Sequence, residues 1–260
     1  MLIQIVLGTL LAGVASVWLA WVLSKSFLSR YPQHMLSLAA GALLATAFIN
    51  LMPEAFESEY SVHSLFLIFF AGLLVVIVLD KAEVWHHAHE HGQAGEQCGH
   101  QHAHRAHGPT GSWSVLFGDG VHAFADGILI ASAFLADWKL GVAATFAVLL
   151  HEVPHHMGDL AVVGSGSSQP RKAVLKVSLA GSMTVVGGLV GYLIVGQLSE
   201  WLPLFLVFAA SSFAYVALAD LIPQLNRPMG LRQTVVQMVW LLVGSLLVTA
   251  AVAVVGGHAH

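Results

Sequence analysis

The sequence predicts an all-α integral membrane protein with eight transmembrane helices. Of its 260 residues, 57% are hydrophobic and only 9% are charged, whereas soluble domains carry about 25% charged residues. Apolar runs of about 20 residues, the length that crosses a bilayer as a helix, recur along the chain. A membrane β-barrel would instead show short segments in which apolar and polar residues alternate. We therefore expect helices as the spanning elements.

Eight apolar segments supply these helices, and together they predict a single transmembrane domain over residues 1–260. The first segment has no positive residue before it and is longer than a signal-peptide core, so we expect it to be retained. The segments are approximately 2–24, 34–55, 62–82, 113–135, 139–163, 172–196, 200–223 and 233–256. Glycines at 181, 187, 188 and 191 in the sixth segment predict close helix packing.

The basic residues predict the orientation of the chain. With eight spans, only Lys139 falls on one side of the membrane. The other nine lysines and arginines fall on the opposite side, and they are Lys25, Arg30, Lys81, Arg105, Arg171, Lys172, Lys176, Arg227 and Arg232. The positive-inside rule therefore places both termini outside. The outer loops carry Glu57, Glu59, Asp137 and Glu200, which form either a mouth that attracts cations or ordinary solvated turns.

Two similar peptides suggest an internal repeat. Asn50-Leu51-Met52-Pro53-Glu54 ends the second segment, and Asp220-Leu221-Ile222-Pro223-Gln224 ends the seventh. The predicted topology makes spans one to three and six to eight an inverted repeat around spans four and five, a plan typical of secondary transporters. Asn50, Glu54 and Asp220 are candidates either for lining a pathway or for hydrogen bonding at helix ends.

Ionisable residues in the fourth and fifth segments predict a metal site. Charged groups at membrane depth cost a few kcal/mol and therefore mark functional sites. His122 and Asp126 are four residues apart, as are His151 and His155, so each pair lies on one helix face. At a rise of about 1.5 Å per residue both pairs lie near mid-membrane. Three imidazoles and one carboxylate suit a divalent ion such as zinc.

Further polar residues surround this set. Glu152 and His156 form a second pair, rotated by one residue, that could hold a second ion, relay protons or orient the first ligands. Asp119 and Asp159 lie one turn or more toward the inner face and are candidates for an exit path. Pro154 removes a backbone donor and is expected to kink its helix.

Residues 84–112 predict a disordered cytoplasmic loop rich in histidine. Such composition cannot bury a core, so its imidazoles predict an adaptable metal buffer, with a passive linker as the alternative. Its histidines are His86, His87, His89, His91, His100, His102, His104 and His107. The lone cysteine, Cys98, excludes a thiolate metal cage. A net charge of −4 with scattered basic residues argues against nucleic-acid binding.

The two ligand segments resemble signatures of the ZIP family of divalent metal transporters. HAFADG is similar to the HNxxDG of that family's fourth helix, and HEVPHHMGD to the HExPHExGD of its histidine-rich subfamily. The resemblance covers essentially the whole chain. It implies uptake into the cytosol of zinc, or of iron, manganese or cadmium, with no organic cofactor. It also implies a homodimer in the plasma or inner membrane, in contact with lipid, whose spans 1, 4, 5 and 6 move against the others.

The resemblance further implies a binuclear centre, with His122, Asp126, His151 and His155 as the primary ligands and Glu152 in the second site. This sequence departs from the family pattern at Ala123, where the family has Asn, and at His156, where the subfamily has Glu. Both positions touch the second site. We therefore expect one tightly bound ion and a second site that is weakened or altered.

Two other functions fit some of the same residues. HEVPH is a literal HExxH, the signature of zinc proteases in which the glutamate is the general base. In an intramembrane protease the aspartate ligand follows this motif, whereas Asp126 precedes it, and His122 would fill the position that water needs. A non-transporting metal sensor could use the same ligands. Import without enzymatic activity is the function that the sequence favours.

Overall fold

The computed structural model is helical throughout the residues that it describes, which are 1–25, 32–89, 109–165, 170–225 and 230–256. No β-strand occurs within these ranges, as the composition predicts. The α-helices are α1 (Leu2–Thr9), α2 (Ser16–Leu23), α3 (Pro32–Ala45), α4 (Met52–Phe56), α5 (Val62–His89), α6 (Pro109–Ala136), α7 (Trp138–Ser165), α8 (Pro170–Gly181), α9 (Met183–Val195), α10 (Leu202–Leu225) and α11 (Leu231–Gly256). A 3₁₀-turn, η4 (Ser199–Trp201), precedes α10.

Six of the helical stretches in the described part of the chain are long and apolar enough to cross a membrane. They are Leu2–Leu23, Gln33–Phe56, Leu116–Ala136, Arg171–Val195, Leu202–Ala219 and Leu231–Val254. The apolar stretch of α5 is shorter, Val62–Val78. Helix α7 carries the ionisable residues His151, Glu152, His155 and His156 of the predicted metal site. The chain is therefore a helical protein with several membrane-spanning segments.

The first two predicted spans are not uniform α-helices. Each contains one π-helical turn, η1 (Leu10–Ala15) between α1 and α2, and η3 (Thr46–Leu51) between α3 and α4. In η3 the side-chain amide of Asn50 donates a hydrogen bond to the Ala45 carbonyl at 3.3 Å. Asn50 thus bonds to its own helix, and such π-turns are frequent near functional sites.

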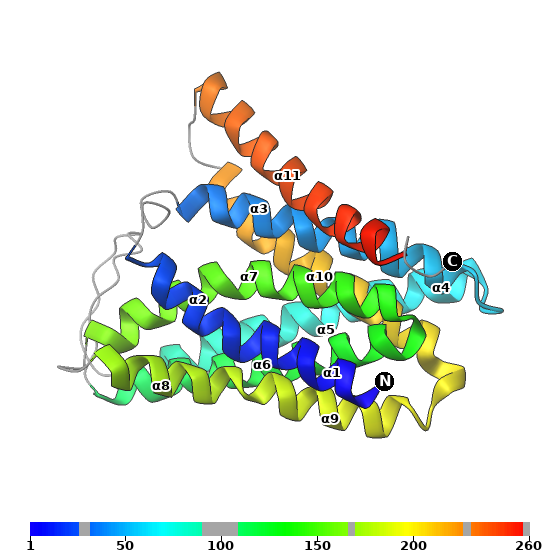
Figure 1. Cartoon of the computed structure of the whole chain (residues 1–260), viewed down its shortest axis with the longest axis horizontal. Coiled ribbons are helices and arrows are strands. Elements are labelled where there is room, and N and C mark those ends of the chain that lie inside the picture. Colours follow the sequence, from blue (N-terminus) through cyan, green and yellow to red (C-terminus); the bar gives the residue numbers. More distant parts are fainter. Residues whose placement is uncertain (26–31, 90–108, 166–169, 226–229, 257–260) are drawn as a thin grey trace.

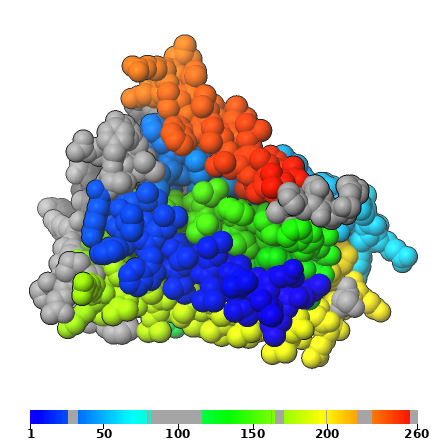
Figure 2. All heavy atoms as spheres, in the orientation of Figure 1, coloured from blue at the N-terminus to red at the C-terminus, as the bar shows by residue number. Residues whose placement is uncertain are grey.

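Helices α6 and α7 form the centre of the bundle. Helix α6 packs most extensively against α9 and also against α7, while α2, α3 and α11 pack on α7. Figure 1 shows α7 between the α3–α11 pair and the group of α1, α6 and α9. In Figure 2 the green atoms of α7 fill the space between blue α1 and α2 and orange α11. Helix α7 therefore lies between other helices, while α6 keeps one face exposed at Phe117 and Val121.

Close contact between α6 and α9 depends on glycine. A Cβ on Gly127 would overlap the Thr184 carbonyl oxygen, and one on Gly187 would overlap the Phe124 carbonyl oxygen. The expectation of close packing by the sixth segment is thus confirmed. That segment is nevertheless two helices, because α8 ends at Gly181 and α9 begins at Met183. At the junction the Val185 N–H bonds the Ser182 carbonyl three residues back, which tightens the turn.

We expect replacement by alanine to destabilise the protein at one helical glycine and to stabilise it at another. Gly187→Ala forces its methyl group into the α6 backbone, and such overpacking costs about 1–3 kcal/mol. Gly164→Ala meets nothing within 4 Å, so removing the flexibility of a helical glycine should stabilise by about 0.5–1 kcal/mol. Thermal unfolding in detergent measures both. Equal shifts of the two variants would contradict the close packing of α6 on α9.

Candidate metal centre

The ligand residues come from two antiparallel helices joined by a tight turn. Helix α6 ends at Ala136 and α7 begins at Trp138. Between them, Oδ1 of Asp137 accepts the Lys139 N–H at 2.7 Å, which caps the start of α7. So short a connection makes the two helices neighbours along their length. Residues at similar distances from this turn therefore face one another, as the sequence predicts for His122 and His155.

One group of ligands, the His122 cluster, consists of His122, His151 and Glu152. Their ligand atoms lie within 4.8 Å of one another. The ring centroids of His122 and His151 are 5.8 Å apart, and Nε2 of His122 lies 3.6 Å from Oε1 of Glu152. Asp126 lies beside this cluster, with Oδ2 at 3.7 Å from the same nitrogen. Three of the four predicted primary ligands are thus close together.

A second group, the Asp119 cluster, consists of Asp119, His155, His156 and Asp159, whose ligand atoms also lie within 4.8 Å. Nδ1 of His155 is 3.5 Å from Oδ1 of Asp119 and 3.3 Å from Oδ2 of Asp159. Nδ1 of His156 is 3.9 Å and 3.5 Å from the same two oxygens. Compared with the His122 cluster, the Asp119 cluster lies closer to the start of α6 and to the end of α7.

His155 lies between the two clusters. Its ring centroid is 5.8 Å from that of His122 and 6.0 Å from that of His151. Its Nδ1, however, faces the carboxylates of Asp119 and Asp159. The structure thus brings His155 near the predicted primary set while directing one of its nitrogens away from that set.

The two clusters bury much negative charge. Asp119, Asp126, Glu152 and Asp159 are all at least nine-tenths buried, and His156 is fully buried. Both carboxylate oxygens of Asp119 and of Glu152 lie inside the protein and make no hydrogen bond within the described part of the chain. Burying carboxylates in this way is costly unless positive charge compensates them. Bound divalent cations would supply that compensation.

The remaining predicted site residues lie elsewhere. Glu54 is half-buried in α4, and the side chain of Asp220 is outside the described part. Helix α7 passes through Pro154 as one helix. Of the predicted loop, the backbone of α5 continues through His89 and α6 begins at Pro109, so both of its ends are helical. The other loop histidines, His91, His100, His102, His104 and His107, fall outside the described residues.

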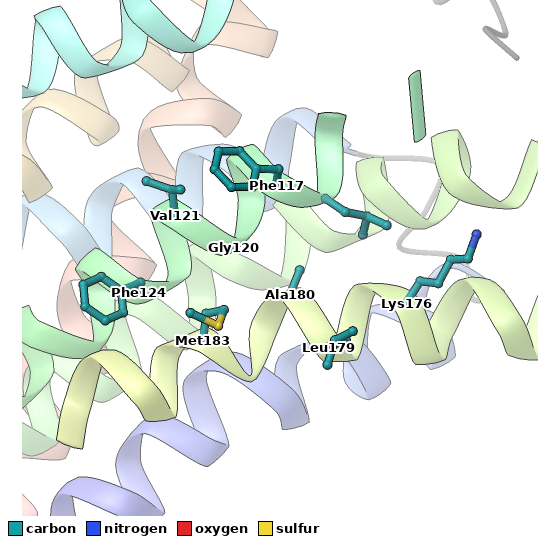
Figure 3. Close-up of a pocket in the computed structure, with 9 residues that line it drawn as sticks. Phe117, Gly120, Val121, Phe124, Lys176, Leu179, Ala180 and Met183 are labelled. Carbon is teal, nitrogen blue, oxygen red and sulfur yellow. The ribbon is translucent and has the colours of Figure 1, made fainter. Parts of the chain in front are cut away.

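A separate cavity of about 770 Å³ lies beside α6. Figure 3 shows Phe117, Val121 and Phe124 of α6 along one side of it, with Leu179 of α8 and Met183 of α9 opposite. Its lining is almost entirely carbon, and none of the ligand residues takes part. This cavity is therefore not the metal centre.

Sequence reasoning assigned Asp119 and Asp159 to a path and did not join them to a site. One signal for the second cluster was present, since Asp159 is four residues after His155 and three after His156, on a shared helix face. Asp119 carries no such signal, because its partners lie on the other helix.

Comparison with known proteins points to one family. A family model described as "ZIP Zinc transporter" matches residues 82–251, which include both clusters. Zinc transporter ZIP10 of Homo sapiens is 34% identical over 164 residues, covering 54% of this chain and 20% of that protein. Zinc transporter ZIP4 of Homo sapiens is 40% identical over 111 residues, covering 43% of this chain and 17% of the relative.

The matched regions thus span about a fifth of the length of these relatives. The family model, in contrast, covers well over half of this chain. Apolar helices that enclose two groups of histidine and carboxylate ligands are consistent with that match. This multi-pass membrane protein belongs to the ZIP zinc transporter family.

Proposed function

We propose that this protein imports a divalent metal ion, foremost zinc, into the cytosol through the ligands between α6 and α7. The observation that carries the proposal is the set of imidazoles and buried carboxylates that α6 and α7 hold close together. Zinc prefers nitrogen and oxygen ligands of this kind. The relatives named as zinc transporters support the same ion, and iron, manganese and cadmium are alternative cargoes with similar ligand preferences.

The proposed topology has eight spans, with α5 and α7 crossing the membrane in addition to the six apolar stretches. The apolar part of α5 is 17 residues long, at the lower limit for a span. Ionisable residues in α7 are tolerated there because other helices enclose them. Both termini would lie outside, and Figure 1 shows the first residue of α1 and the end of α11 at the same end of the bundle.

The transport cycle that we propose alternates access to this centre. Spans 1, 4, 5 and 6 include both ligand-bearing helices, and α6 packs closely on α9 through Gly127 and Gly187. In the proposed cycle these four spans would move against spans 2, 3, 7 and 8. The inverted repeat predicted from the sequence and a homodimer in the plasma or inner membrane complete the proposal. Entry from an acidic outer face would concentrate cations at the centre.

Proteolysis by the HEVPH motif is not favoured by the position of Glu152. A general base must reach the water that it activates. Glu152 is only 2% exposed, and its two oxygens face His122 at 3.6 Å and His156 at 3.0 Å. Its surroundings suit a ligand or a group that orients ligands.

Zinc flux into proteoliposomes tests the proposed function. We expect saturable uptake by the full chain and none by empty liposomes. A variant with serine at His91, His100, His102, His104 and His107 should keep that uptake, because the proposed path lies within the helices. Well-folded protein that binds zinc without flux would contradict import and favour a sensor. Loss of flux in the serine variant would place an essential site in residues 90–108.

A further inference from the structure

We propose that the cavity beside α6 binds an acyl chain of an anionic phospholipid, whose head group is held by Lys172 and Lys176 of α8. None of the metal-ligand residues lines this cavity. The inference therefore goes beyond the proposed import of metal ions and is tested separately from it. Figure 3 shows the cavity with α6 on one side and α8 and α9 on the other.

The cavity forms because α6 separates from the sixth span toward the start of both. The two run in the same direction, since Gly120 lies against Met183, and Gly127 lies against Gly188. A Cβ on Gly127 would overlap the backbone nitrogen of Gly188, whereas one on Gly120 would meet only the Met183 side chain, at 3.6 Å. The backbones are thus in contact at Gly127 and apart at Gly120, where the cavity lies.

The lining of the cavity suits an acyl chain. Apart from Lys176, every lining residue is glycine or has an apolar side chain. Phe117 and Leu179, from opposite walls, are 76% and 67% exposed, so the cavity opens to the outside of the bundle, where lipid lies. From Phe117 to Phe124 the wall extends about 10 Å along α6. That length is about two-thirds of the hydrocarbon depth of one leaflet, which is about 15 Å.

One end of the cavity carries positive charge. Lys176 lines it, and Lys172 lies four residues earlier on the same face of α8. Helix α8 has three basic residues and no acidic one. In Figure 3 the Lys176 nitrogen points away from Phe124, toward the end of the cavity. The apolar stretch that contains α8 begins at Arg171, so these amines lie near the level where hydrocarbon gives way to lipid phosphates.

The amines, rather than the apolar walls, should select the lipid. Lipid tails are as apolar as the side chains that line the cavity, so chains of the same length should fill it equally well. Each lysine near a membrane surface strengthens the attraction to anionic lipid about fivefold, and basic pockets between membrane helices bind anionic head groups in this way. Two lysines should therefore favour an anionic over a zwitterionic lipid about 25-fold.

The chain's own histidine-rich segment is a poor occupant of the cavity. Residues 90–108 contain no Leu, Ile, Val, Phe or Met. Their polar side chains would lose water against carbon walls without gaining hydrogen bonds, which is unfavourable. A phospholipid combines the apolar chain and the negative charge that the cavity and its lysines match.

Native mass spectrometry of the full chain in detergent tests this site with phosphatidylglycerol and phosphatidylcholine of identical acyl chains. We expect the parent to bind one phosphatidylglycerol about 25-fold more tightly than phosphatidylcholine. The double variant Lys172→Gln, Lys176→Gln should bind both lipids equally. Lys25→Gln is the control, because Lys25 follows α2, which packs on α8, and its amine lies over the Trp21 ring rather than in the cavity. It should keep the preference.

A second variant, Gly120→Leu, tests the cavity itself. Its side chain should fill the space beside Met183 while both lysines remain, so binding of both lipids should weaken at least tenfold. Unchanged helical circular dichroism shows that each variant is folded.

Three results would overturn the proposal. One is equal binding of the two lipids by the parent, and another is a phosphatidylglycerol preference that survives loss of both lysines. The third is a dimer of the parent that Gly120→Leu converts to a monomer, because a second copy of the chain would then cover the cavity. Zinc flux enters none of these outcomes.

Discussion

The double variant His122→Ala, His151→Ala should abolish saturable zinc uptake in proteoliposomes. These two imidazoles come from different helices, and their ring centroids lie 5.8 Å apart beside Glu152. Loss of groups that merely orient a metal ligand typically weakens binding 10- to 100-fold. Removing two ligands should therefore exceed this range and bring flux to the level of empty liposomes.

His63→Ala is the matched control for this experiment. His63 is an exposed histidine of α5, and it belongs to neither ligand cluster. Its replacement should leave uptake within error of the parent chain. If the double variant folds and retains the flux of the parent, zinc crosses by a path that avoids the His122 cluster, and the proposed centre is wrong.

The variant Asp126→Asn should be more stable than the parent without metal and should gain less from zinc. Asp126 is 5% exposed, and its contact with His122 at 3.7 Å is too long for a good hydrogen bond. A neutral amide avoids much of the cost of burying a charge at membrane depth, which is about 2.5–3.5 kcal/mol. Zinc at 100 times the Kd stabilises by about 2.7 kcal/mol, and a site weakened a hundredfold gains only about 0.4 kcal/mol.

Melting temperatures with and without zinc measure both effects. Asp137→Asn is the control, because asparagine caps a helix about as well as aspartate and Asp137 lies at the turn between α6 and α7. Its zinc-induced shift should equal that of the parent. An Asp126→Asn variant with an unchanged zinc shift would show that this carboxylate is not a ligand.

Much of the fold could be predicted from the sequence because hydropathy is a local property. The predicted segments 113–135 and 139–163 lie within α6 and α7, and their ends differ by a few residues. The π-turn that contains Asn50 and the break at Ser182 could not be predicted. Both are single-turn changes in backbone hydrogen bonding, which leave the apolar pattern of the segment intact.

The same division applies to the metal centre. The sequence by itself determined that His122 and Asp126 share one face of their helix, and that His151 and His155 share one face of the next, because residues four apart lie on the same helix face. Only the tertiary structure decided that Nδ1 of His155 faces Asp119 and Asp159, and that His156 joins them. Spacing along a chain fixes the face of a helix. The rotation of each helix about its axis and the rotamer of each ring are set by packing between helices, so they required the three-dimensional structure.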